Sequence, residues 1–228
     1  MKYSQLLTKM RDFYIEDAQY AVRSKRFIGM LEERILDDIW DQLTSKGKKI
    51  LKKGHEVEIL QDAKIKNVDI AIIDPNSGPL ITVGIRSQMN SIAKNTLTYF
   101  QDIRGELTGL IQRYPLSVHG YVYMHPKEII NAPGKKYKKE NINHSKYARI
   151  AAGISGRGEE PQIIVNNSHL IRNSYDFFSY FVVDFDKESV TYKDNWDELE
   201  LGIDLSLDRF VDNIIKTCKR RFYFTGYF

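Results

Sequence analysis

The stretch VDIAIIDPNSGPLITVGIR (68–86) decides the fold of this chain. Its first seven residues are nearly all apolar, which is typical of a central strand. The turn residues DPNSG (74–78) stop that strand, and LITVGIR (80–86) is a second, mostly apolar strand. We therefore predict that the two strands form a hairpin within a sheet.

The neighbouring segments extend this hairpin into an α/β domain. Upstream, HEVEIL (55–60) alternates polar and apolar residues, as a half-buried strand does. Apolar residues at helical spacing predict helices at about 3–21 and 24–44, the second ended by Lys46-Gly47, and at about 91–113. Further downstream we expect a strand at 118–124, apolar runs at 163–167 and 177–185, a hairpin through 190–194 and a helix at about 206–221.

Length and composition fit a single domain covering residues 1–228. The chain is 42% hydrophobic and 28% charged, which excludes a wholly disordered protein. No apolar run approaches the roughly 18 residues of a membrane span, and the N-terminus has no secretory signal pattern. Cys218 is the sole cysteine, so neither an internal disulfide nor a cysteine-based zinc site is expected. We expect a cytoplasmic protein.

Positive charge is concentrated in residues 131–158, where seven bases accompany one acid, Glu140. The C-terminal tail adds four more bases and no acid. A basic, Gly- and Tyr-containing segment suits contact with a phosphate backbone, although a solvated loop has the same composition. The seven bases are Lys135, Lys136, Lys138, Lys139, Lys146, Arg149 and Arg157.

Asp69 is the first candidate for chemistry, because it lies inside the apolar run VDIAII. A buried aspartate needs a partner, which is either a structural one such as a buried arginine or a divalent cation bound in a cleft. On the next strand, Thr82, Gly84, Arg86 and Gln88 alternate and so share one face. Polar residues that could meet an anion follow at the next helix start: Asn90, Ser91, Lys94 and Asn95.

The helix before the sheet supplies a second acid. Glu32 and Glu33 interrupt its apolar stripe, and we expect Glu32 to be solvated. Glu33 is the better candidate, because it follows Gly29 by four residues at a position that would let other backbone approach.

These residues resemble the core motif of the PD-(D/E)XK nucleases, a superfamily that includes many type II restriction endonucleases. The resemblance covers about residues 25–125 and implies a restriction-endonuclease-like core: a helix, a three-strand meander, a helix and a strand, in a central mixed sheet flanked by helices. To this core the chain would add the basic insertion (about 131–160) and C-terminal strands and a helix (161–228). The motif aspartate falls on Asp69, the (D/E)xK element on Gly84-Ile85-Arg86, fifteen residues later, and the helix glutamate on Glu33. The resemblance also implies that the carbonyl of Ile85 binds metal.

Two departures from the motif matter. Gly84 replaces the motif acid, so a second metal-binding acid must come from elsewhere, with Glu33 first and Glu56, Glu58 or Glu106 as weaker alternatives. Arg86 replaces the motif lysine and cannot act as a general base, because its pKa stays above about 12. It can neutralise charge in the transition state, and Gln88 could orient the attacking water.

The resemblance implies Mg²⁺-dependent hydrolysis of double-stranded DNA by a homodimeric, sequence-specific restriction endonuclease, accompanied in function by a DNA methyltransferase. The many Lys, Asn, Ile and Tyr residues fit a rare cutter of AT-rich sites. A repair or junction-resolving nuclease, a DNA-binding protein that has lost cleavage and an unrelated small-molecule activity remain alternatives. Candidate base readers are Asn90, Asn95, Asn141, Asn143 and Asn166.

Overall fold

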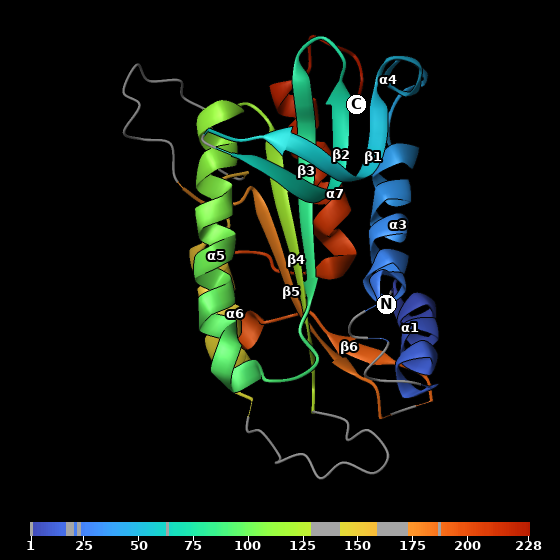
Figure 1. Ribbon diagram of the computed structural model, residues 1–228, viewed down its shortest axis with the longest axis vertical. Coiled ribbons are helices and arrows are strands. Elements are labelled where there is room, and N and C mark those ends of the chain that lie inside the picture. Colours follow the sequence, from blue (N-terminus) through green and yellow to red (C-terminus); the bar gives the residue numbers. More distant parts are fainter. Residues whose placement is uncertain are drawn as a thin grey trace.

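A computed structural model describes residues 2–16, 21, 24–62, 64–128, 142–158, 173–186 and 188–228 (Figure 1). Its centre is a six-stranded mixed sheet with the strands in sequence order. The first three strands form an antiparallel meander, the third, fourth and fifth are parallel, and the sixth is antiparallel to the fifth. The strands are β1 (Lys52–Leu60), β2 (Ile65–Asp74), β3 (Gly78–Ser87), β4 (Val118–Pro126), β5 (Phe177–Asp184) and β6 (Thr191–Lys193).

Helices cover both faces of this sheet. One face packs against α1 (Ser4–Glu16), α3 (Lys25–Asp41) and α7 (Leu207–Arg221) in a core that contains Leu7, Leu31 and Phe210. The other face packs against α5 (Ile92–Arg113) and α6 (His144–Gly153) through Phe100, Tyr121 and Tyr147. All residues of β4 and β5 are therefore buried, as expected of strands covered on both sides. The remaining elements are the short helix α4 (Ser45–Ile50) and the 3₁₀ turn η2 (Asp197–Leu199).

The predicted order of helix, three strands, helix and strand is confirmed, and the chain is an α/β protein. One predicted helix end is wrong. The helix α3 ends at Asp41, and Thr44 then caps the new helix α4 by accepting a hydrogen bond from the N–H of Gly47. Gly47 is required there because the carbonyl of Tyr227 lies where a side chain would begin. The apolar run at 163–167 lies outside the described residues. Within the described residues no helix is long and apolar enough to cross a membrane.

Candidate functional site

Asp69 lies where β2 and β3 stop pairing. The β2–β3 register includes Ile70 opposite Val83, and beyond this pair the carboxylate of Asp69 accepts the N–H of Ile85 at 2.6 Å. In the part of the chain that the structure describes, this backbone group is the hydrogen-bond partner of Asp69, and the buried arginine considered above is not found there. The contact joins the two elements of the predicted motif.

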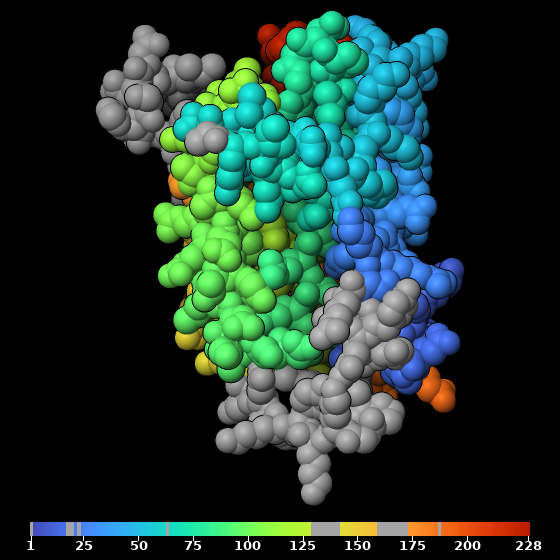
Figure 2. Space-filling view, in the orientation of Figure 1, coloured from blue at the N-terminus to red at the C-terminus, as the bar shows by residue number. Residues whose placement is uncertain are grey.

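A cavity of about 160 Å³ adjoins Asp69 between the sheet and α5. Thr82, Gly84 and Arg86 all line it, so the prediction that they share a face is confirmed. The end of the β1–β2 hairpin reaches across to α5, as Figure 2 shows. There Lys66 and Glu106 form an ion pair at 2.6 Å beside the cavity.

Gly84 has a packing reason to lack a side chain. A Cβ at this position would lie 2.5 Å from Cε2 of the Tyr121 ring, which covers the strand. The ring of Tyr121 is nearly completely buried, so it cannot move aside easily. The space that a motif acid at position 84 would need is thus occupied by an aromatic side chain.

Arg86 is held by an aromatic ring of α5. Its guanidinium carbon lies 3.5 Å from the centroid of the Tyr99 ring, a close cation–π contact. The side chain is half-buried and lines the cavity that Asp69 also lines. A permanent cation is therefore present near Asp69.

Glu32, and not Glu33, is the helix carboxylate near Asp69. Burial, with the negative charges of Asp69 and Glu56, raises the pKa of Glu32 to about 7, against the lowering effect of the charge of Lys25. Burial likewise raises the pKa of Asp69, although the Ile85 N–H opposes this. These three acids, Asp69, Glu32 and Glu56, are called the carboxylate cluster below.

The prediction for Glu33 is wrong for a geometric reason. Glu32 lies four residues after Ile28 and four before Leu36, so it shares their sheet-facing side of α3. Glu33 falls on the exposed side, and a Cβ at Gly29 would meet nothing within 4 Å, so no backbone approaches there. The spacing from Ile28 and Leu36 was the available sequence signal. Of the other acids, Glu106 lines the cavity and Glu58 is exposed.

Gln88 does not serve the cavity beside Asp69, contrary to the prediction. It is buried, and its amide oxygen accepts from the hydroxyl of Tyr123 at 2.5 Å. The hydroxyl of Thr96 lies 2.9 Å from the same oxygen but has its shorter contact, 2.6 Å, with the carbonyl of Ile92. Its amide nitrogen donates to the carbonyl of Ser91 at 3.1 Å. Gln88 therefore fixes the junction between β3 and α5 and is not free to orient a water at Asp69.

The predicted DNA-contacting residues divide into three groups. Arg157 is a correction: it is 4% exposed and pairs with the buried Asp176 at 3.2 Å, so it cannot reach a phosphate. Lys135, Lys136, Lys138 and Lys139 lie outside the described residues. The rest are accessible at least in part: Asn90, Ser91, Lys94, Lys146 and Arg149 are exposed and Asn95 is half-buried.

The carboxylate cluster has the donor chemistry of a hard cation such as Mg²⁺, since it offers carboxylate oxygens whose charges repel one another. Among the described residues, no group of three or more His, Cys, Asp or Glu side chains is arranged to hold a metal ion. Mg²⁺ keeps several water ligands, so one or two carboxylates suffice to hold it. Asp69 and Glu32 are the carboxylates of the cluster that such an ion would use.

The fold and the site define an α/β protein with a six-stranded mixed sheet and a partly buried carboxylate cluster near the point where two central strands separate. No family model, curated protein or solved structure matches the chain significantly.

Proposed function

We propose that this chain is a Mg²⁺-dependent endonuclease for double-stranded DNA, specifically a type II restriction endonuclease that acts as a homodimer. The observation that carries the proposal is the 2.6 Å contact between Asp69 and Ile85, because it unites the two motif elements at one point of the sheet. The element order α3, β1–β3, α5 and β4 supports it, since this is the order that the resemblance implies. A DNA methyltransferase would protect the host in such a system.

Each residue of the site has a proposed role. Asp69 and Glu32 would hold Mg²⁺, with the carbonyl of Ile85 as a further ligand. When bound, the ion would polarise the phosphate and make hydroxide available near neutral pH. Arg86 would leave the ring of Tyr99 to neutralise the charge that develops on the phosphate. The exposed bases of α6, Lys146 and Arg149, would contact the DNA backbone.

A DNA-binding protein without cleavage is the second candidate, and Gly84 is the observation that favours it. The ring of Tyr121 occupies the space of the motif acid, so the chain lacks one of the usual carboxylates. Such a protein would keep the fold and the exposed bases of α6 but would not hydrolyse DNA.

The test is to incubate the purified protein with plasmid and phage DNA, in Mg²⁺ and in EDTA, and to separate the products on gels. Discrete bands that require Mg²⁺ are the expected result, and mapping their ends gives the recognition site. A smear would indicate a repair nuclease that reads DNA shape. Intact DNA with retarded mobility would favour the non-cleaving candidate.

A further inference from the structure

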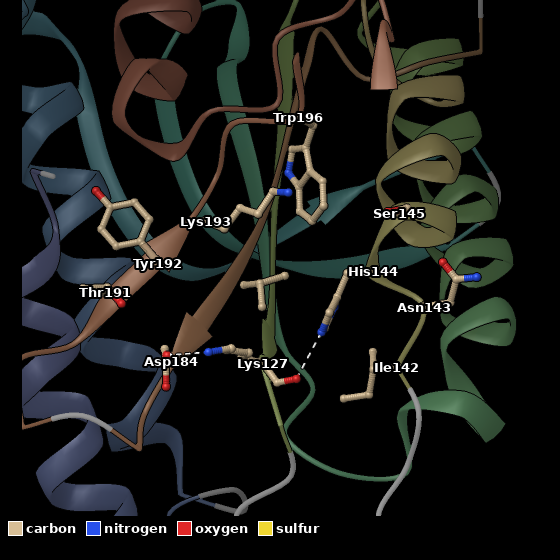
Figure 3. Close-up of a pocket in the computed structure, with 11 residues that line it drawn as sticks. Lys127, Ile142, Asn143, His144, Ser145, Asp184, Thr191, Tyr192, Lys193 and Trp196 are labelled. Carbon is tan, nitrogen blue, oxygen red and sulfur yellow. Dashed lines mark hydrogen bonds and ion pairs between the residues drawn. The ribbon is translucent and has the colours of Figure 1, made fainter. Parts of the chain in front are cut away.

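A second, larger cavity lies at the other end of the parallel strands. It has a volume of about 900 Å³, at the carboxyl ends of β4 and β5 and beside the first turn of α6. It shares no lining residue with the cavity beside Asp69. Open α/β sheets bind ligands at the carboxyl ends of their strands, and this volume is that of a small-molecule site. Figure 3 shows its lining: Lys127, Ile142, Asn143, His144, Ser145, Val182, Asp184, Thr191, Tyr192, Lys193 and Trp196.

A buried chain of hydrogen bonds leads from this cavity into the protein. His144 Nε2 lies 3.3 Å from the carbonyl oxygen of Lys127, and His144 Nδ1 lies 3.0 Å from the hydroxyl of Tyr180. That hydroxyl lies 2.9 Å from His125 Nδ1, and His125 Nε2 lies 3.3 Å from the amide oxygen of Gln88. The orientation of the Gln88 amide follows from its other contact, because its nitrogen must donate to the carbonyl of Ser91.

This chain of hydrogen bonds lacks one hydrogen when both histidines are neutral. Its two ends, the Lys127 carbonyl and the Gln88 amide oxygen, can only accept hydrogen bonds. Four contacts therefore need four hydrogens, but neutral His144, Tyr180 and neutral His125 supply one each. One contact must lack its hydrogen.

The missing hydrogen belongs at the cavity end. His125 is completely buried, so an unpaired nitrogen facing Gln88 could gain no other donor and would be costly. His144 borders the cavity, where an incoming group can supply the hydrogen. His125 then carries its proton on Nε2 and His144 on Nδ1, which leaves His144 Nε2 and the Lys127 carbonyl as two acceptors facing each other. Burial lowers the pKa of both histidines, in keeping with the neutral forms.

We propose that this cavity binds a mononucleotide whose base carries an exocyclic amine, as adenine and cytosine do. The amine has two hydrogens for the two acceptors, His144 Nε2 and the Lys127 carbonyl. Ile142, Val182 and Trp196 give the base an apolar lining. Lys193 lies over the Trp196 ring at 4.4 Å and forms an ion pair with the exposed Glu198, which the phosphate of the nucleotide would share or replace. The proposal does not depend on nuclease activity, since no residue of the carboxylate cluster takes part.

Isothermal titration of the full chain with dAMP, dTMP and inorganic phosphate at pH 8 tests the proposal. We expect dAMP to bind about tenfold or more tightly than dTMP, because the single ring N–H of thymine is flanked by two carbonyls that would face the same acceptors. His144→Leu should weaken dAMP binding by a similar factor. His55→Leu, an exposed histidine of β1, is the matched control and should change nothing. Inorganic phosphate that binds as tightly as dAMP, or a lack of dAMP binding, would overturn the proposal.

The histidine tautomers give a second readout that needs no variant. Nitrogen-15 NMR of the histidine rings should find His125 protonated on Nε2 and His144 on Nδ1 at pH 8. Binding of dAMP should weaken as the pH falls, because a proton on His144 Nε2 supplies the missing hydrogen itself. A proton on His144 Nε2 at pH 8 would contradict the proposal. The described titratable groups around His144 are Lys127, His125, Tyr147, Tyr180, Asp184 and Lys193.

Discussion

Asp176 is buried and Asp69 is half-buried at the same sheet, and their partners differ. Asp176 is 0% exposed, pairs with Arg157 and Arg221, and accepts the backbone N–H of His119 at 2.7 Å. Asp69 accepts one backbone N–H, and its surroundings include the negative charges of Glu56 and Glu106.

The difference separates a structural carboxylate from a functional candidate. Asp176 pairs with two arginines and accepts a backbone N–H, so its carboxylate is fully engaged and ties the start of β5 to α7. In the carboxylate cluster Glu56 pairs with Lys25 at 2.5 Å, and Lys66 and Arg86 line the cavity beside Asp69, but among the described residues Asp69 and Glu32 form no ion pair. Burial of a charge therefore does not by itself mark a site, whereas incomplete compensation leaves room for a cation.

The largest expected effect comes from removing the negative charge of Asp176. Asp176→Asn should lower the free energy of unfolding by about 3–5 kcal/mol, because it removes the buried carboxylate that pairs with Arg157 and Arg221. Denaturant unfolding measures the loss. Asp41→Asn, which removes an exposed ion pair with Lys48, is the control and should stay within about 0.5 kcal/mol of the original protein. A small loss of stability for Asp176→Asn would mean that Asp176 does not have the structural role that separates it from Asp69.

A methyl group at Gly84 should be the next most costly change. Gly84→Ala should destabilise the protein by about 1–3 kcal/mol, because its Cβ would meet the enclosed Tyr121 ring. Gly105→Ala on α5, where nothing lies within 4 Å, should instead stabilise by about 0.5–1 kcal/mol through helix propensity. Thermal and denaturant unfolding should show a loss of stability for Gly84→Ala and a gain for Gly105→Ala. Equal effects at the two glycines would remove the packing explanation for the missing motif acid.

The burial of Glu32, together with the nearby charges of Asp69 and Glu56, predicts that stability depends on pH. The pKa of Glu32 is about 7 in the folded chain, above its ordinary 4.5, so the folded state holds this proton more tightly and loses stability as the pH rises from about 5 to 8. Glu32→Gln should therefore be more stable than the original protein at pH 8, by about 1 kcal/mol after solvent screening, and equal to it near pH 5. Denaturant unfolding across this range measures the difference. A comparable pH trend in the exposed Glu33→Gln would contradict the assignment.

The smallest expected effect concerns the exposed bases of α6. Replacing Lys146 and Arg149 by Gln should weaken DNA binding on all sequences and make the salt dependence of log K shallower by about 1–2. Lys48→Gln, an exposed lysine of α4, serves as the control. DNA-binding titrations at several salt concentrations measure this slope. An unchanged slope would exclude α6 from the DNA-binding surface.

Much of the fold could be predicted from the sequence, because periodicity reports burial directly. The run VDIAII identified both a central strand and the unusual Asp69 within it. Glu32 was missed because neighbouring helix positions differ by about 100° in direction, and a one-residue error exchanges the sheet-facing side for the solvent. The role of Arg157 was unpredictable, since its partner Asp176 is nineteen residues away and meets it only through tertiary packing.

The most direct test of the role of Asp69 is to measure DNA cleavage and unfolding on one preparation of Asp69→Asn, beside the original protein in Mg²⁺. Cleavage should fall by at least the roughly 10–100-fold that loss of a group supporting a metal site costs. Stability should be kept or raised, because the amide oxygen can still accept the Ile85 N–H without a buried charge. Unchanged cleavage, or a loss of stability like that expected for Asp176→Asn, would contradict a metal-binding role and make Asp69 a structural residue.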